Sequence, residues 1–265
     1  MDHGHSRPLQ GEYEVLCLFV AGFSLRRSGI SLERLSVSKP QEKYLVSRIE
    51  DGSPLNSSTD IIREPLLLYY ILKRLIDIIL AAVGMMVLIP VFLAIAICIK
   101  LDDGGDVLFC REMIGLRGRR FTILKFRSMI PNADVYLEQR PELMLEYQKN
   151  MKLKHDPRIT RVGSFLRKTA LDELPQLFNV LVGHMSLVGP RSLPASELTR
   201  YGEYAEKRLT AKPGITGLWQ ISEHRHISYD ERIPLDMQYI DNRSILLDLF
   251  ILIKTLKVVI VHAKG

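Results

Sequence analysis

The chain has 265 residues, with 36 Lys and Arg against 30 Asp and Glu and a formal net charge of +6. Apolar residues make up 47% of it and charged residues 25%, which excludes a wholly disordered, collagen-like or coiled-coil chain. Its three cysteines, Cys17, Cys98 and Cys110, lie far apart, which excludes a disulfide scaffold and a simple cysteine zinc site. The positive charge favours an anionic partner: a membrane surface, a nucleic acid or a phosphorylated substrate.

Residues 1–65 differ from the rest of the chain. They hold scattered Ser, Gly and Pro and one short apolar run, Val15 to Phe23, which is too short to span a bilayer. Acidic residues precede the run where a secretory signal peptide carries basic ones. We expect a poorly ordered N-terminal extension over 1–65.

The main apolar run, Ile78 to Ile99, holds 22 residues without a formal charge. As a helix it would be roughly 33 Å long, enough to cross the hydrocarbon core. Pro90 lies past its middle, where it removes a backbone hydrogen bond and favours a kink. Basic residues flank both ends, so the positive-inside rule gives no orientation. Two interpretations stay open: a kinked helix that enters and leaves by one face, and an ordinary transmembrane helix with a tolerated proline.

The chain after Leu101 alternates extended and helical stretches with Gly and Pro between them. The expected strands are Val107–Cys110 and Phe121–Phe126, and the expected helices are Asn132–Met151, Leu171–Val182, Leu198–Leu209 and Ile245–Val261. The last helix is apolar around most of its circumference. That pattern is typical of an interfacial helix or of a core helix, and the membrane-entering run upstream favours the interface.

The most informative local pattern is an adjacent carboxylate pair, Asp172 and Glu173. Asp172 is a natural N-cap, because Pro175 is tolerated only in the first turn of a helix. Both carboxylates would then lie at the positive end of a helix dipole, which lowers their pKa and also attracts phosphate. The plainer alternative is a simple cap beside a solvated glutamate.

A carboxylate that attacks phosphorus must be ionised, lie beside a cation and meet an electrophile whose charge is neutralised. Arg167 and Lys168 lie just upstream, and a divalent metal on Glu173 would supply the neutralisation. Two windows, Arg111–Arg127 and Lys152–Lys168, each carry six basic residues against one acidic residue. Together they favour anion binding over an ordinary solvated surface.

Two glycine turns follow, Val188–Arg191 and Pro213–Gly217. Backbone amides in such turns hold phosphate oxygens in many proteins, and Arg191 is placed to grip them bidentately. Neither turn matches a Walker loop or a dinucleotide fingerprint.

Six stretches resemble, in the same order, motifs of the monotopic phosphoglycosyl transferases, the bacterial sugar transferases that begin exopolysaccharide, capsule and O-antigen units. They are Lys73-Arg74-x-x-Asp77, Lys125–Met129, Asp156–Gly163, Leu171–Leu177, Met185–Arg191 and Pro213–Gln220.

The resemblance does not cover the extension 1–65, and for the rest of the chain it implies an α/β, mainly helical fold with two parts. These are a membrane-entering helix hairpin over 66–101 kinked at Pro90, and a catalytic domain over 102–265 with an interfacial C-terminal helix. It implies a bacterial inner-membrane enzyme whose small catalytic domain faces the cytoplasm and contacts an anionic membrane surface. The reaction would move a hexose 1-phosphate from a UDP-sugar to undecaprenyl phosphate and release UMP.

The resemblance also implies roles for residues. Asp172 would be the nucleophile, Glu173 would help to hold Mg²⁺ (or Mn²⁺), and Arg167 and Arg191 would contact phosphate. Further predicted phosphate-binding residues are Lys125, Arg127, Arg161 and Arg225.

Four positions depart from the family pattern: Ile89 before the proline, Arg111–Met113, Ser192, and Glu223–Arg225, where Arg225 would replace the usual loop arginine. The central Asp172-Glu173 pair is intact, so we expect an active enzyme.

Whether the protein forms a homodimer stays open. The alternatives are a non-enzymatic, basic, membrane-associated scaffold of a polysaccharide complex and a nucleic-acid binder. The sequence shows no stacking platform for nucleic acid, so no nucleic-acid partner is expected.

Overall fold

The computed structural model describes residues 64–150, 153–222 and 229–263. The predicted extension therefore lies outside the described residues except for its last two, which belong to the first helix. Arg225 and the departure around it also lie outside them.

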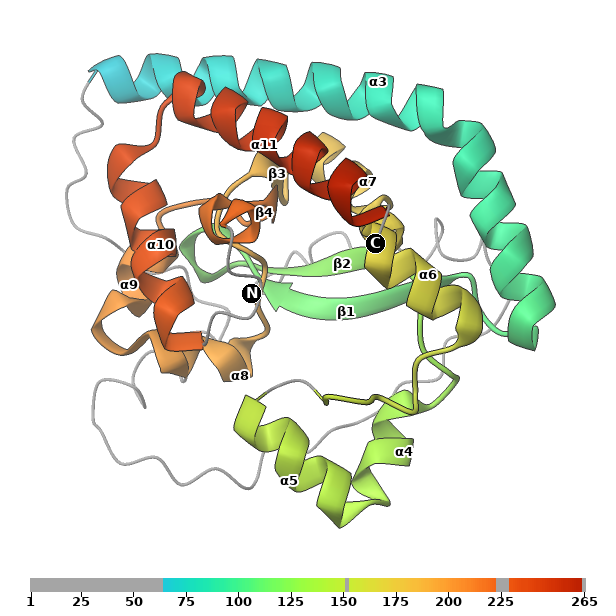
Figure 1. Ribbon diagram of the computed structural model, residues 1–265. Coiled ribbons are helices and arrows are strands. Elements are labelled where there is room, and N and C mark those ends of the chain that lie inside the picture. Colours follow the sequence, from blue (N-terminus) through green and yellow to red (C-terminus); the bar gives the residue numbers. More distant parts are fainter. Residues whose placement is uncertain (1–63, 151–152, 223–228, 264–265) are drawn as a thin grey trace, which may run out of the picture.

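A single helix, α3 (Glu64–Asp103), contains the whole apolar run. It is long and apolar enough to cross a membrane, by length and composition, and most of its apolar surface is exposed. Figure 1 shows that α3 crosses above the other elements and then bends down beside them. Pro90 lies inside the helix, where its missing N–H favours a bend. The re-entrant topology stays a prediction.

A hairpin follows α3. Strand β1 (Leu108–Ile114) pairs antiparallel with β2 (Arg120–Phe126), from Leu108 opposite Phe126 to Ile114 opposite Arg120. Both predicted strands are confirmed, and β1 runs farther than expected. The connection turns through Arg117 and Gly118, both with positive φ.

Two predicted helices are broken. The helix expected over 132–151 is two helices, α4 (Ala133–Glu138) and α5 (Pro141–Asn150), because Pro141 starts a helix more readily than it continues one. The helix expected over 198–209 is α8 (Ala195–Leu198), a 3₁₀ segment (Thr199–Tyr204) and α9 (Ala205–Arg208). Gly202, with φ of +51°, interrupts the helical path there.

Two short strands that the sequence did not predict, β3 (Ser186–Val188) and β4 (Gly214–Thr216), pair in parallel. Glycine is required where they meet, because a Cβ on Gly214 would lie 2.1 Å from the Gly189 nitrogen.

The remaining helices enclose the core. They are α6 (Arg161–Thr169), α7 (Gln176–Leu181), α10 (Tyr229–Asn242) and α11 (Ile245–Ala263). The main core joins β1, β2, β3 and α7 to α10 and α11, with Ile123, Val180 and Ile251 fully buried at its centre. The predicted C-terminal helix is confirmed as α11, which lies beside α3 in Figure 1 and contacts it.

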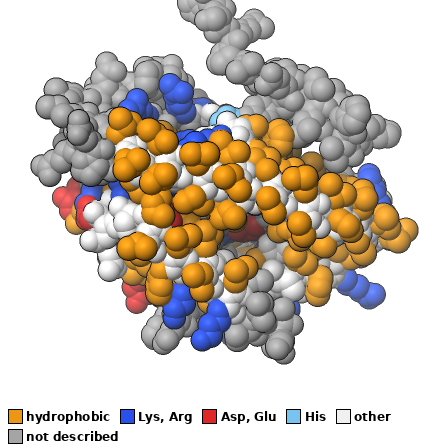
Figure 2. Space-filling view, turned by 90° about the horizontal axis from the view of Figure 1, so that it is seen from above, with side chains coloured by type: hydrophobic (Ala, Val, Ile, Leu, Met, Phe, Trp, Pro, Cys, Tyr) orange, Lys and Arg blue, Asp and Glu red, His pale blue; other side chains and the backbone are white. Residues whose placement is uncertain are grey.

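One face of the molecule is apolar. Figure 2, seen from above, shows hydrophobic side chains gathered over α3 and the neighbouring helix. The exposed large apolar side chains of α11 include Leu246, Leu249, Phe250, Ile253 and Leu256. Such a continuous patch is a mark of an interaction surface.

Candidate active site

The carboxylate pair lies in a reversal between two helices. Helix α6 ends at Thr169, and the next residue, Ala170, has a φ of +56° that turns the chain into a 3₁₀ segment (Leu171–Glu173). The predicted capping role of Asp172 is wrong: α7 starts at Gln176, Pro175 precedes it, and no described side chain caps it. The amides of Glu173 and Leu174 already donate to the carbonyls of Ala170 and Leu171, which leaves the Asp172 carboxylate out of that turn's hydrogen bonds.

Glu173 is the centre of a charge cluster. Its Oε1 accepts a hydrogen bond from Lys125 Nζ at 2.9 Å and one from Arg191 Nη2 at 2.5 Å. Arg191 and Lys125 lower the pKa of Glu173 to about 2, against the opposing effect of burial. The two cations come from β2 and from the turn after β3, so tertiary structure assembles the cluster.

Asp172 behaves differently from its neighbour. Its side chain is buried, with 9% of the residue exposed, and no described residue donates a hydrogen bond to its carboxylate. Burial and the charge of Glu173 raise the pKa of Asp172, while Lys125, Arg167 and Arg191 partly offset the increase. The predicted lowering of the pKa is therefore right for Glu173 and wrong for Asp172.

Two arginines flank the pair, each held from one side. Arg167, on the last turn of α6, donates from Nε to the Ser128 hydroxyl at 2.8 Å. The backbone carbonyl of Arg191 accepts a hydrogen bond from the buried Arg208 at 2.5 Å. Arg167 is thus held by its inner nitrogen and Arg191 by its backbone, and the positive charges of both act on Asp172.

The structure brings together Asp172, Glu173, Lys125, Arg167 and Arg191, all of which the sequence analysis had singled out. It places the other two described phosphate-binding candidates elsewhere.

Arg127 forms an ion pair with Asp103 at the end of α3 and donates to the Asp106 carbonyl. Its guanidinium lies against Gly105, where an added Cβ would displace it. Arg161 is exposed on the first turn of α6. Phosphate binding by either residue stays a prediction.

The glycine turns have a structural explanation. The Gly189 amide donates to the Thr216 carbonyl and the Gly214 amide to the Pro190 carbonyl, each at 2.9 Å. These two amides hold β3 and β4 together, so neither is available to a phosphate group. Phosphate binding by the rest of the two turns stays a prediction.

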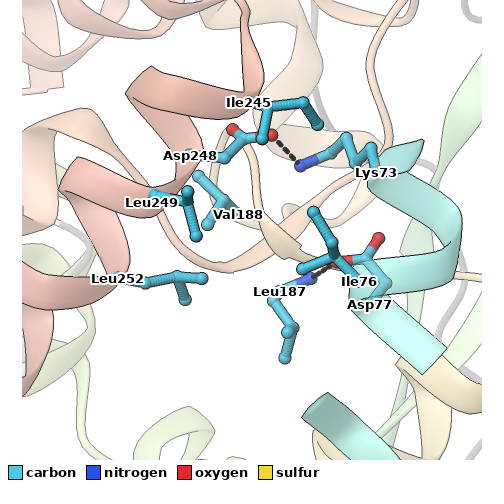
Figure 3. Close-up of a pocket in the computed structure, with 9 residues that line it drawn as sticks. All are labelled: Lys73, Ile76, Asp77, Leu187, Val188, Ile245, Asp248, Leu249 and Leu252. Carbon is cyan, nitrogen blue, oxygen red and sulfur yellow. Dashed lines mark hydrogen bonds and ion pairs between the residues drawn. The ribbon is translucent and has the colours of Figure 1, made fainter. Parts of the chain in front are cut away.

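The Lys73-Arg74-x-x-Asp77 motif joins α3 to the rest of the protein, a role that the sequence analysis missed. Lys73 pairs with Asp248 of α11 at 2.7 Å, and Asp77 accepts from the Leu187 amide of β3 at 3.0 Å (Figure 3). These residues line a pocket between α3, β3 and α11 that contains neither member of the carboxylate pair. The basic pair Lys73 and Arg74, next to an apolar run, is the sequence signal that could have predicted polar partners for the start of this helix.

A divalent metal fits this site only if a ligand shares it. The described residues contain no group of three or more side chains suited to hold a metal ion. Among the residues that the structure describes, Glu173 Oε2 makes only one long contact, 3.4 Å from Arg191 Nη1, and the Asp172 carboxylate accepts no hydrogen bond. Mg²⁺ is commonly bound by one or two carboxylates together with phosphate oxygens, and this donor set matches that arrangement.

Comparison with known proteins identifies the family. The sequence profile of the bacterial sugar transferases matches residues 68–262, and the chain belongs to this family. It is 46% identical over 194 residues to an uncharacterized sugar transferase of Haemophilus influenzae. It is 43% identical over 191 residues to the exopolysaccharide production protein ExoY of Rhizobium meliloti. It is 45% identical over 194 residues to an undecaprenyl-phosphate galactose phosphotransferase of Salmonella typhimurium.

The matched region covers about 72% of this chain in the Haemophilus comparison and 71% in the other two. It spans 84% of ExoY but only 41% of the Haemophilus protein and 40% of the Salmonella protein. The match therefore covers most of ExoY, whereas this chain spans only about two fifths of the length of the other two relatives.

Proposed function

We propose that this protein transfers a hexose 1-phosphate from a UDP-sugar to undecaprenyl phosphate, releases UMP and thereby starts a polysaccharide unit. The observation that carries the proposal is a buried carboxylate, Asp172, without a described hydrogen-bond partner among three cations. A relative that the chain matches at 45% identity carries the name of such a phosphotransferase.

The proposed reaction has two displacements at one phosphorus atom. An Asp172 carboxylate oxygen attacks the phosphorus that bears the sugar, the bond to the bridging oxygen breaks, and UMP leaves with the electron pair. A phosphate oxygen of undecaprenyl phosphate then attacks the same phosphorus, and the Asp172 carboxylate leaves. Charge and atoms balance in each step, and the enzyme returns to its starting state.

The site residues suit these steps. Raising the pKa of Asp172 makes its carboxylate a stronger nucleophile once ionised. Arg167 and Arg191 lie where they would stabilise the charge of the diphosphate, and Glu173 holds Lys125 and Arg191 in place. A bound Mg²⁺ would supply further neutralisation on the leaving phosphate, with Glu173 as its protein ligand.

The exposed apolar face explains how a soluble donor and a lipid acceptor would meet. We propose that α3 and α11 lie in the membrane, with α3 re-entrant, and that the site faces the cytoplasm just beyond the headgroups. Glucose and galactose are the first donors to test, by likeness to enzymes that start exopolysaccharides.

The test is UMP release by the full chain in detergent, with Mg²⁺, undecaprenyl phosphate and a panel of UDP-hexoses. We expect release with at least one donor and a lipid-linked product of matching amount. Labelled donor without acceptor should leave an acid-phosphate adduct on Asp172. Product formation without any such adduct would remove the covalent step, and no UMP release with any donor would favour the scaffold alternative.

A further inference from the structure

We propose that Ser128 is a positioning residue, which holds the Arg167 guanidinium over Asp172 and thereby sets the rate of phosphoryl transfer. The inference rests on the proposed function and adds a residue to it. It starts from the 2.8 Å hydrogen bond between Arg167 Nε and Ser128 Oγ.

The hydrogen bond leaves the two terminal nitrogens of Arg167 for a ligand. Among the described residues, no group accepts a hydrogen bond from either of them. Arg167 lies on the last turn of α6, and after the reversal at Ala170 the segment Leu171–Glu173 packs against that helix. The bond to Ser128 therefore restrains a guanidinium on the helix that contacts the Asp172 segment, and it leaves the outer two nitrogens for a phosphate group.

The backbone of Ser128 is fixed independently of its hydroxyl. The Ser128 carbonyl accepts a hydrogen bond from the Thr160 amide. The Thr160 hydroxyl in turn accepts a hydrogen bond from the Gly163 amide and so caps the start of α6. A Cβ on Gly163 would lie 2.0 Å from the Ser128 carbonyl oxygen, so α6 packs directly on that residue. Arg167 follows Gly163 by four residues, one helical turn, and therefore projects from the same side of α6.

The end of β2 thus supplies one partner to Glu173 and one to Arg167. Lys125, inside β2, donates to Glu173, and Ser128, two residues after β2 ends, accepts from Arg167. Ser128 is buried and itself carries no charge, so its chemical contribution is the orientation of its partner. Arginine has many rotamers in water, and an unheld guanidinium would spend most of its time away from the site.

The experiment compares UMP release by the full chain and by Ser128→Ala in detergent. We expect kcat/KM for the UDP-sugar to fall roughly tenfold, the size expected for one lost charge-assisted hydrogen bond. Ser128→Thr keeps the hydroxyl and should restore most of the activity. Ser164→Ala is the matched control, because Ser164 is an exposed serine on α6, the helix of Arg167, and this variant should resemble the wild type.

A double substitution separates positioning from other roles. Arg167→Lys keeps the charge but has a methylene where the bonded Nε lies, so it cannot make this hydrogen bond. In that background Ser128→Ala should cause no further loss, and the thermal unfolding temperature of Ser128→Ala should stay within about 2 °C of the wild type.

Three results would overturn the inference. Wild-type activity in Ser128→Ala would overturn it while leaving the proposed function intact, and so would an equal, multiplicative loss in the Arg167→Lys background. Absence of UMP release by the wild type would overturn the proposed function, and this inference with it.

Discussion

Asp172 and Glu173 are neighbours in the chain, yet their surroundings shift their pKa values in opposite directions. Both are buried, which disfavours the charged form of each. For Glu173 the pKa is lowered overall, because Lys125 and Arg191 form hydrogen bonds with its carboxylate and outweigh the effect of burial. For Asp172 the same cations act only through their charge, and the pKa stays raised. The pair therefore divides into a stably ionised anchor and a more basic carboxylate, the division expected of a site with one reacting acid.

The first prediction concerns the folding free energy that the protein loses by burying the ionised carboxylate of Asp172. Because folding raises the pKa of Asp172, the folded protein binds its proton more tightly than the unfolded chain, and the ionised form destabilises the fold at neutral pH. Asp172→Asn should therefore raise the thermal unfolding temperature by about 2–4 °C. It should also lower UMP release by about a thousandfold or more. A lower unfolding temperature would contradict the assigned burial.

Glu173→Gln should have the opposite effect on stability. The pKa of Glu173 lies at about 2, below the ordinary value of about 4.3, so its ion pairs stabilise the fold fully above that ordinary value. This stability is lost as the pH falls from about 4 towards 2. We expect the variant to unfold at a lower temperature than the wild type at pH 7, with the difference shrinking below pH 4. A difference that is independent of pH would argue for lost packing instead.

The rate should also depend on pH through Asp172. Only the ionised carboxylate attacks phosphorus, so a raised pKa moves the acid limb of the pH–rate profile above the ordinary aspartate range, near 3.9. Single-turnover UMP release, measured from pH 4 to pH 8, should rise with pH and then level off. A rate that stays constant down to pH 4 would contradict the shift.

At the scale of elements, one side chain joins α7 to β2. Asn179 is fully buried; its Oδ1 accepts from the Leu124 amide at 3.0 Å, and its Nδ2 donates to the Thr122 carbonyl at 2.7 Å. The carboxamide thus occupies the place of a further strand along the edge of β2. Since α7 follows the carboxylate pair directly, this contact also fixes the pair against Lys125.

Asn179→Ala should destabilise the protein by roughly 2–4 kcal/mol, because it leaves the buried Leu124 amide and the half-buried Thr122 carbonyl unpaired. Denaturant unfolding in detergent would measure the change. Asn242→Ala, at an exposed helix end, is the control and should change stability by no more than about 0.5 kcal/mol. Equal stability of the two variants would show that water replaces the Asn179 contacts.

Local sequence signals predicted these elements unequally. The strands β1 and β2 and the helix α11 follow from their apolar patterns, and α4 and α5 were joined into one helix only because the signal of Pro141 was not used. The strands β3 and β4 are three residues each and are defined by pairing across 28 residues. No local pattern could reveal them, since their stability comes from the partner strand.

At the scale of the whole molecule, the apolar face and the charged site lie on different parts of one compact unit. The polar contacts of Lys73 and Asp77 join α3, the candidate membrane helix, directly to α11 and β3. If α3 lies in the membrane as proposed, these contacts would hold the site at a fixed height above it rather than on a flexible tether.

Environment-sensitive labels would test the membrane face. In a chain whose cysteines are replaced by serine, a fluorophore on Ile253→Cys should shift to the blue when the protein is reconstituted in vesicles, because Ile253 is 68% exposed on the apolar face. A fluorophore on Val135→Cys, exposed on α4, should keep its spectrum in water. Identical spectra at the two positions would contradict the proposed face.

Tags would test the path of α3. A re-entrant helix leaves tags at residues 1 and 265 both protected from protease added outside intact cells. Cleavage of the tag at residue 1 alone would show that α3 spans the membrane.

The sequence by itself determined the family, the apolar run with Pro90, and the residue types of the site, because these are written in consecutive motifs. Tertiary structure alone decided what those residues do to one another. It pairs Glu173 with Lys125 and Arg191, and Arg127 with Asp103, as ion pairs. It also brings Arg167 into hydrogen-bond distance of Ser128. The physical reason is that charge interactions depend on distance and burial, and neither can be read from positions tens of residues apart in a chain.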